Sequence, residues 1–219
     1  VGVGANLGAT LSAMYSMNQK SQYICVEPVA EYLDILQRNI LLNPSIDSGQ
    51  ISTLNVAISD KNKQVDILSK GGTGFQQDGG GSTVNALTLD SIIASTPVAL
   101  IKIDTDGYDW QVLKSGQKTI AESKPILFFE LQIDNRAALN NYLVEIAKLI
   151  ELDYYFFFFD NYGNFLYTLN DKFLLKEKLF YIMGSQNDSK LVYFDVLAVH
   201  PTDDLFMKIP LLISNYVET

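Results

Sequence analysis

Short apolar runs alternate with stretches of helical periodicity through the first 150 residues of this chain. Apolar runs end near residues 3, 27, 56, 103 and 130, and apolar residues between them recur every three or four positions, as at Tyr32, Leu36 and Ile40. Strands that alternate with helices in this way form βαβ units, which build a parallel sheet. The sequence therefore predicts an α/β fold.

The pattern changes after residue 150. The run Tyr154–Phe159, a turn at 160–164 and the return run Phe165–Tyr167 predict an antiparallel hairpin, and residues 191–199 predict a last strand. A chain of 219 residues with 47% hydrophobic content can bury one sizeable core, and no linker or repeat divides it. We expect a single domain over residues 1–219, with an incomplete first strand because Val1 lies almost directly before a glycine loop.

Composition excludes several classes of partner. The 25 acidic and 16 basic residues give a net charge of -9, and no basic cluster offers a surface for nucleic acid. The longest apolar run, Tyr154–Phe159, is far shorter than the roughly 20 residues of a membrane helix, and no signal peptide opens the chain. Cys25 is the only cysteine, so no internal disulfide forms, and we expect a buried thiol. These features predict a cytoplasmic protein without membrane attachment.

A glycine loop follows the first strand. Gly4 and Gly8 lie between a strand end and a helix start, where backbone N–H groups and the helix dipole favour an anion or a carboxylate-bearing cofactor. Glu27 ends the next strand, 19 residues beyond Gly8, where an acid can bind the ribose hydroxyls of a cofactor. Together they predict an adenosine cofactor; the structural alternative is a tight turn followed by a solvated strand end.

The cofactor could be a nicotinamide dinucleotide or S-adenosylmethionine. None of the twelve tyrosines precedes a lysine by four residues, as a short-chain dehydrogenase would require. The only histidine, His200, follows the last strand, and we interpret it as a surface loop residue. Hydride transfer is therefore the weaker interpretation.

An acidic block, Asp104-Thr105-Asp106-Gly107-Tyr108-Asp109, follows the apolar strand that ends at Ile103. Ligands bind beyond the carboxyl ends of the strands in open α/β sheets, and Glu130 should end the neighbouring strand. Crowded carboxylates raise one another's pKa, which suits proton transfer near neutral pH. Asp104 is the first candidate for a base or an orienting group. For Asp106 and Asp109 we favour a structural role, as caps of a helix expected to begin near Tyr108.

Glycines are dense in the stretch 71–81. Such a stretch favours a mobile surface connection between strands, and a lid over a site is the alternative.

Several runs of residues resemble one known family. They are Val3-Gly4-Ala5-Asn6-Leu7-Gly8, Glu27-Pro28, Asn55-Val56-Ala57, Thr88-Leu89-Asp90, the block from Ile101 to Asp109, Pro125 to Glu130, and Asp195 to Val199. The chain resembles the FkbM family of S-adenosylmethionine-dependent methyltransferases. The resemblance implies the Rossmann-like class I methyltransferase fold, with a mainly parallel seven-stranded sheet and a C-terminal antiparallel hairpin.

The resemblance also implies an activity and a set of site residues. The activity is O-methylation of a hydroxyl on a glycan or small metabolite. Cofactor contacts are implied for Gly4, Ala5, Asn6 and Gly8 at the methionine end, Glu27 and Pro28 at the ribose, and Val56 and Ala57 at the adenine; the catalytic candidates are Asp104, Glu130 and Asp106. No metal is implied. The chain departs from the family pattern at Gly2, where an acid is usual, and at Asp106 and Asp109, where glutamate is common.

Two alternatives stay open. Asp104 and Asp106 could hold a divalent cation in a nucleotide-sugar glycosyltransferase, although that function does not explain the glycine loop with Glu27. A non-catalytic methyltransferase-like binding module is the other alternative.

Overall fold

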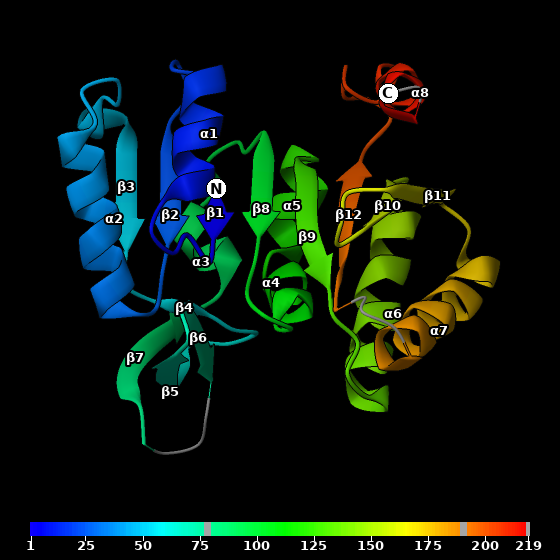
Figure 1. Ribbon diagram of the computed structural model, residues 1–219, viewed down its shortest axis with the longest axis horizontal. Helices are drawn as coiled ribbons and strands as arrows, with labels where there is room; N and C mark the ends of the chain where they lie inside the picture. The colour runs from blue at the N-terminus through cyan, green and yellow to red at the C-terminus, as the bar shows by residue number, and fades with distance from the viewer. Residues whose placement is uncertain (77–79, 189–191, 218–219) are drawn as a thin grey trace. The chain divides into compact units, whose positions relative to one another are not determined.

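The computed structural model describes residues 1–76, 80–188 and 192–217 (Figure 1). The chain divides into two compact units. The first contains Val1–Thr96 and Ile101–Thr119, and the second contains Pro97–Leu100 and Ile120–Thr219. The expected single domain stays a prediction.

The first unit is built on parallel strands. Their order is β8 (Leu100–Ile103), β1 (Gly2–Val3), β2 (Tyr23–Val26) and β3 (Ile51–Leu54). Val3 lies opposite Ile103 on one side and opposite Val26 on the other. Because the strands run in one direction, their carboxyl ends, including those of β1, β2 and β8, meet at one edge. The predicted parallel βα arrangement is confirmed.

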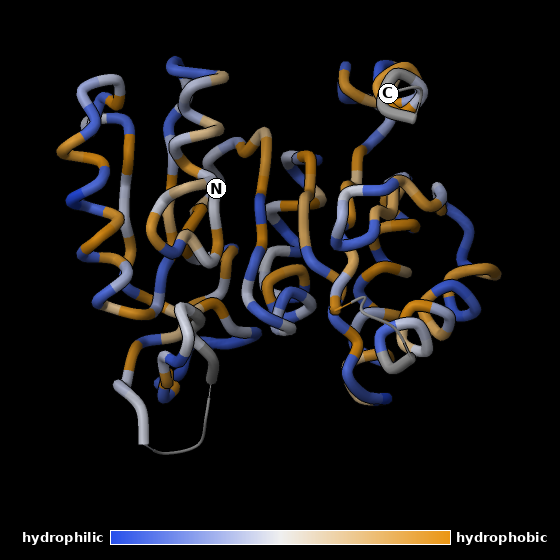
Figure 2. Tube along the Cα trace, viewed as in Figure 1, coloured by the Kyte–Doolittle hydropathy of each residue, from blue (hydrophilic) through white to orange (hydrophobic). Residues whose placement is uncertain are grey.

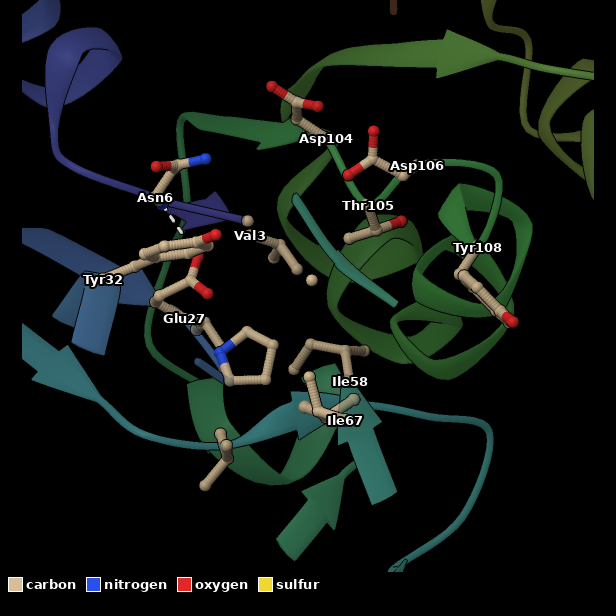
Figure 3. A pocket seen from close by; sticks show the side chains of 16 residues that line it. Val3, Asn6, Glu27, Tyr32, Ile58, Ile67, Asp104, Thr105, Asp106 and Tyr108 are labelled. Carbon is tan, nitrogen blue, oxygen red and sulfur yellow. Dashed lines mark hydrogen bonds between the residues drawn. The ribbon is translucent and has the colours of Figure 1, made fainter. Parts of the chain in front are cut away.

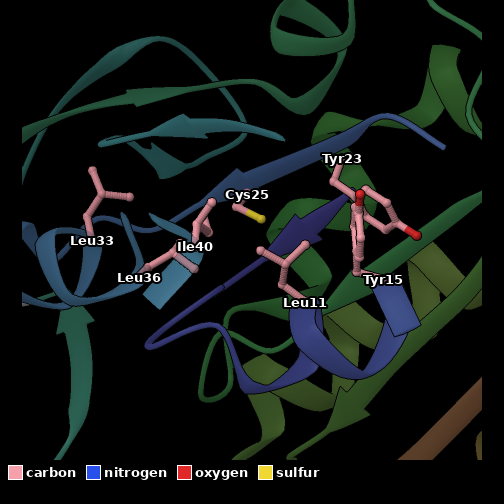
Figure 4. Packing of buried hydrophobic residues seen from close by; sticks show 7 residues of the cluster. All are labelled: Leu11, Tyr15, Tyr23, Cys25, Leu33, Leu36 and Ile40. Carbon is pink, nitrogen blue, oxygen red and sulfur yellow. The ribbon is translucent and has the colours of Figure 1, made fainter. Parts of the chain in front are cut away.

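Two helices cover hydrophobic residues of this sheet. They are α1 (Ala9–Met17) and α2 (Ala30–Leu42). Along α2, hydrophobic and polar residues alternate with the helical turns (Figure 2), and Leu36 and Ile40 lie on the buried side. They pack in one cluster with Leu11, Tyr15, Tyr23, Cys25 and Leu33 (Figure 4). Cys25 is buried, as expected, and its burial raises the pKa of the thiol to about 11.

A second, smaller sheet follows β3 in the chain. Its order is β4 (Ala57–Ile58), β7 (Ser82–Leu87), β5 (Lys63–Lys70) and β6 (Thr73–Gln76), with β5 antiparallel to both β6 and β7. Only part of β5 was predicted. Gly71 and Gly72, both with positive φ, form the turn between β5 and β6, so this part of the glycine stretch belongs to a hairpin. Residues 77–79 lie outside the described residues.

The second unit is antiparallel. The strand order is β9 (Ile126–Leu131), β12 (Phe194–Val199), β10 (Tyr155–Asp160) and β11 (Phe165–Leu169). The predicted hairpin is therefore confirmed as β10 and β11. The helices of this unit include α6 (Arg136–Glu151), α7 (Lys172–Asp188) and α8 (Ile209–Val217). Within the described ranges, no helix is long and apolar enough to cross a bilayer.

The surface interpretation of His200 is wrong. The side chain is buried, its Nδ1 accepts a hydrogen bond from the backbone N–H of Thr202 (3.2 Å), and its ring meets the edge of Tyr154. Burial lowers the pKa of His200, and the positive charge of Lys124 adds to that effect.

The helix expected to begin near Tyr108 is α4 (Asp109–Ser115), and a second helix, α5 (Gln117–Ser123), follows after Gly116. Gly116 packs closely on Leu89, since a Cβ there would lie 2.6 Å from its Cδ2. Pro28 does not lie in the first turn of α2. The Glu27 carboxylate accepts the N–H of Val29 and holds that residue extended as the N-cap, so the helix begins at Ala30. A short helix, α3 (Leu89–Ile93), is capped by Thr88, whose side chain accepts the N–H of Ser91.

The end of β1 is fixed by a close approach of two backbones. Gly4 has a φ of +75°, and a Cβ there would lie 1.7 Å from the backbone oxygen of Asp104. A Cβ at Gly2 would meet nothing within 4 Å. Any side chain at position 4 would therefore force β1 and β8 apart, whereas position 2 has room.

We expect Gly4→Ala to lower the free energy of unfolding by at least about 3 kcal/mol, because overpacking and left-handed backbone strain add. The matched control Gly2→Ala should stay within about 1 kcal/mol of the unsubstituted protein. Urea denaturation of both variants measures this difference. Equal stability of the two would contradict the tight packing of Gly4 against Asp104.

Candidate functional site

A cavity of about 720 Å³ opens at the carboxyl edge of the parallel strands in the first unit (Figure 3). All the lining residues belong to the first unit: Val3, Gly4, Asn6, Val26, Glu27, Pro28, Tyr32, Val56, Ala57, Ile58, Ile67, Gly74, Asp104, Thr105, Asp106 and Tyr108.

The glycine loop is held by internal hydrogen bonds. The N–H groups of Gly4 and Ala5 both donate to the Val26 carbonyl oxygen (3.0 Å each), and that of Asn6 donates to Glu27 Oε2 (2.8 Å). The expectation that the N–H groups of the loop are free for an anion is therefore wrong for these three. They serve to tie the loop to the end of β2.

Of the predicted loop residues, Gly4 and Asn6 line the cavity, whereas Ala5 and Gly8 do not. Gly8 is the N-cap of α1, with a φ of +91°, and a Cβ there would lie 2.5 Å from Leu36 Cδ1. Gly8 therefore permits the turn and the packing of α1 near α2. Ala5 lines a smaller cavity on the other side of the loop.

Glu27 is a buried carboxylate rather than a solvated strand end. Its side chain is 4% exposed, and it accepts the N–H of Val29 at Oε1 (3.0 Å) as well as that of Asn6 at Oε2. Burial raises the pKa of Glu27; Asp104 and Asp106 add to this, and the two N–H bonds oppose it. A carboxylate has about four acceptor sites, so two bonds leave capacity for ligand hydroxyls.

One part of the wall is apolar. It contains Val56 and Ala57, both predicted, and also Ile58, Ile67 and Tyr32, which sequence reasoning missed as site residues. Ile58 and Ile67 come from the second sheet. The alternation of Val65 and Ile67 with polar neighbours indicates a half-buried strand, but no sequence signal places that strand over the end of β2.

The acidic block supplies another part of the wall, with Asp104 and Asp106 near each other (Figure 3). Asp104 follows β8 and forms an ion pair with Lys102. Asp106 has a φ of +50°, which aspartate tolerates better than most residues. Partial burial raises the pKa of Asp106, the negative charge of Asp104 raises it further, and the positive charge of Lys102 opposes both.

Asp109 has a structural role. It is 0% exposed, and its Oδ2 accepts hydrogen bonds from the backbone N–H (3.1 Å) and the hydroxyl (2.5 Å) of Thr105. It lies in the first turn of α4, where a carboxylate is favourable. Asp106 does not cap this helix: the N-cap is Tyr108, which makes no side-chain capping bond. The predicted capping role of Asp106 is wrong because the chain makes a left-handed turn before α4 begins.

Glu130 belongs to the second unit, where it lies in β9 opposite Asp195 and its backbone oxygen accepts the Tyr142 hydroxyl. Its catalytic role stays a prediction. In the parts of the chain that the structure describes, no group of three or more His, Cys, Asp or Glu residues is arranged to hold a metal ion.

The comparison with protein families decides the class of the chain. The family described as the methyltransferase FkbM domain matches residues 2–160. This chain belongs to the FkbM methyltransferase family. The family match includes the glycine loop, Glu27 and the acidic block, so the predicted resemblance is confirmed.

Solved structures agree on the fold. A methyltransferase FkbM from Methylobacillus flagellatus is 16% identical with a TM-score of 0.55, and the match covers 89% of this chain and 42% of that one. This chain therefore spans less than half of that protein. The likeness confirms the predicted Rossmann-like α/β fold.

Two further structures match more weakly. The plantazolicin methyltransferase BpumL, in complex with SAH, is 9% identical with a TM-score of 0.44, and the match covers 91% of this chain and 74% of that one. The protein LPL1258 from Legionella pneumophila is 10% identical with a TM-score of 0.47, with coverage of 94% and 60%. No curated protein matches the sequence.

The two FkbM carboxylates Asp106 and Asp109 should respond oppositely to conversion to asparagine. Asp109→Asn weakens charge-assisted bonds to Thr105 in a buried position, and we expect it to lower the free energy of unfolding by about 1 to 3 kcal/mol. Asp106→Asn should raise it at neutral pH, because a raised pKa in the fold means that ionised Asp106 is destabilising.

The benefit of Asp106→Asn should appear as the pH rises through the ordinary carboxyl pKa of 3.8 and become constant above the raised pKa of the folded state. Denaturant titration over this pH range measures both variants. A loss of stability in Asp106→Asn equal to that in Asp109→Asn would contradict the division of the block into a site residue and a structural residue.

Proposed function

We propose that this chain binds S-adenosylmethionine in the cavity of the first unit and transfers the methyl group to a hydroxyl of a glycan or small metabolite. The observation that carries the proposal is the buried Glu27 carboxylate, which faces the cavity at the end of β2 and is bonded to the glycine loop. Membership of the FkbM family supports the methyl donor.

The residues of the cavity fit the chemistry of the cofactor. Glu27 has acceptor capacity for the ribose hydroxyls, and Val56, Ala57 and Ile58 offer an apolar surface for adenine. Glu27, Asp104 and Asp106 give the cavity wall a negative charge that suits a sulfonium. Since the N–H groups of residues 4–6 are already bonded, the carboxylate of the methionine end must use other donors.

The two aspartates have different roles in the proposed transfer. When bound, S-adenosylmethionine supplies an electrophilic methyl group; the protein must orient the acceptor oxygen and take its proton. Asp104, held by Lys102 at the cavity edge, is the group that orients the acceptor hydroxyl. Asp106, whose pKa lies above that of an ordinary carboxyl, is suited to accept the proton. Glu130 is kept as a further candidate.

Ligand titration tests the cofactor. We expect calorimetry to show binding of S-adenosylhomocysteine and none of NAD or of a nucleotide sugar with Mn²⁺. Glu27→Ala is expected to weaken that binding at least about tenfold, because it removes the acceptor for the ribose hydroxyls. Binding of the nucleotide sugar with Mn²⁺ alone would replace the methyltransferase by the glycosyltransferase alternative.

Substitution of Asp104 tests the chemistry. With labelled S-adenosylmethionine and a panel of glycans and hydroxylated metabolites, Asp104→Asn should lower turnover at least about a hundredfold, because the acceptor hydroxyl loses the group that orients it. The affinity for S-adenosylhomocysteine should stay within about threefold, because Asp104 acts on the acceptor. Unchanged turnover would assign Asp104 a structural role. Binding without transfer to any acceptor would favour the non-catalytic module.

A further inference from the structure

Lys102 is a largely buried cation whose ion-pair partner, Asp104, lines the functional cavity. Its side chain is 14% exposed, whereas that of its partner Asp104 is 36% exposed. Burial of an ammonium group is costly unless an opposite charge compensates it. The ion pair with Asp104 provides that compensation, and removal of Asp104 would leave a poorly solvated ammonium group.

The backbone explains why Lys102 reaches Asp104. The two residues are two positions apart at the end of β8, so their side chains leave the strand on one face. Gly2 is the partner of Lys102 in the neighbouring strand β1, and position 2 carries no side chain. With Gly2, Leu11 and Met14, Lys102 lines a second, mainly apolar cavity of about 370 Å³ beside the glycine loop. Lys102 therefore borders this mainly apolar cavity, while its ammonium group pairs with the Asp104 carboxylate.

The charges of this pair change the pKa values of other carboxylates at the site. The negative charge of Asp104 acts on Glu27, at the end of β2, and on Asp106, in the turn after β8. It raises the pKa of both. The positive charge of Lys102 lowers the pKa of Asp106. Lys102 thus holds the Asp104 carboxylate and also opposes the effect of the Asp104 charge on the pKa of Asp106.

We propose that Lys102 is a positioning residue: its ammonium group fixes the Asp104 carboxylate at the cavity edge so that the carboxylate orients the acceptor hydroxyl. This inference rests on the methyl transfer proposed above. Lys102 acts through Asp104 and needs no contact with either substrate. Arginine can preserve the role, because it keeps the charge and can bond a carboxylate.

The first test uses the protein without ligand. Carboxyl-carbon NMR titration should show that Lys102→Met raises the pKa of Asp106 and that Lys102→Arg restores it. The matched control Lys114→Met, which removes the more exposed ion pair with Asp60, should leave Asp106 unchanged. An Asp106 titration that is the same in Lys102→Met and the unsubstituted protein overturns the proposal.

The second test separates positioning from cofactor binding. Lys102→Met should lower kcat for the acceptor about tenfold to a hundredfold, with S-adenosylhomocysteine affinity within about threefold and recovery in Lys102→Arg. Added to Asp104→Asn, Lys102→Met should cause no further loss of kcat. Independent, multiplicative losses would overturn the inference. Failure of S-adenosylhomocysteine to bind the unsubstituted protein would instead remove the proposed function and leave the titration result valid.

If Lys102→Met does not fold, the unsubstituted protein and Asp104→Asn suffice. The ammonium resonance of Lys102 should exchange slowly with water in the former and rapidly in the latter. Equal exchange in the two proteins would show that Asp104 does not hold Lys102, and would overturn the proposal.

Discussion

The close approach of Gly4 to the backbone of Asp104 is the constraint on which the site depends. It brings the glycine loop, which follows β1, against the residue that ends β8, and it leaves no space for a side chain between them. The N–H of Asp104 donates to the Val3 carbonyl oxygen, and the N–H of Gly4 donates to that of Val26. The ends of three parallel strands are thereby locked together, so the acids that follow β2 and β8 line one cavity.

Once the strand ends are fixed, the hydrogen bonds and charges around each acid give it a different role. Glu27 is buried and bonded to backbone N–H groups, Asp104 is paired with Lys102, and Asp109 accepts two hydrogen bonds from Thr105. Asp106 is left with a raised pKa in a left-handed turn. These four carboxylates of the first unit thus have four different environments, which the groups around each of them set.

Much of the fold could be predicted because its signals are local. The alternation of apolar runs with helical periodicity indicates parallel βα units, and the aromatic run with its turn indicates the hairpin of β10 and β11. Gly4, Asn6, Glu27, Val56, Ala57, Asp104 and Asp106 were predicted and line the cavity. Ile58 and Ile67 were missed because the second sheet forms by pairing of distant, short strands, which no periodicity reports.

The sequence by itself determined the order of the elements, the acidic character of the site and the family, because these follow from residue types and their spacing. Tertiary structure decided which N–H groups of the loop are already bonded, which aspartate is buried, and that Lys102 is the partner of Asp104. The bonds of the loop depend on distances between strands that are far apart in the chain, whereas the Lys102–Asp104 pair joins side chains two positions apart at the end of β8. The pKa and the role of a carboxylate depend on the groups that surround it in space, and the spacing of residues along the sequence does not identify those groups.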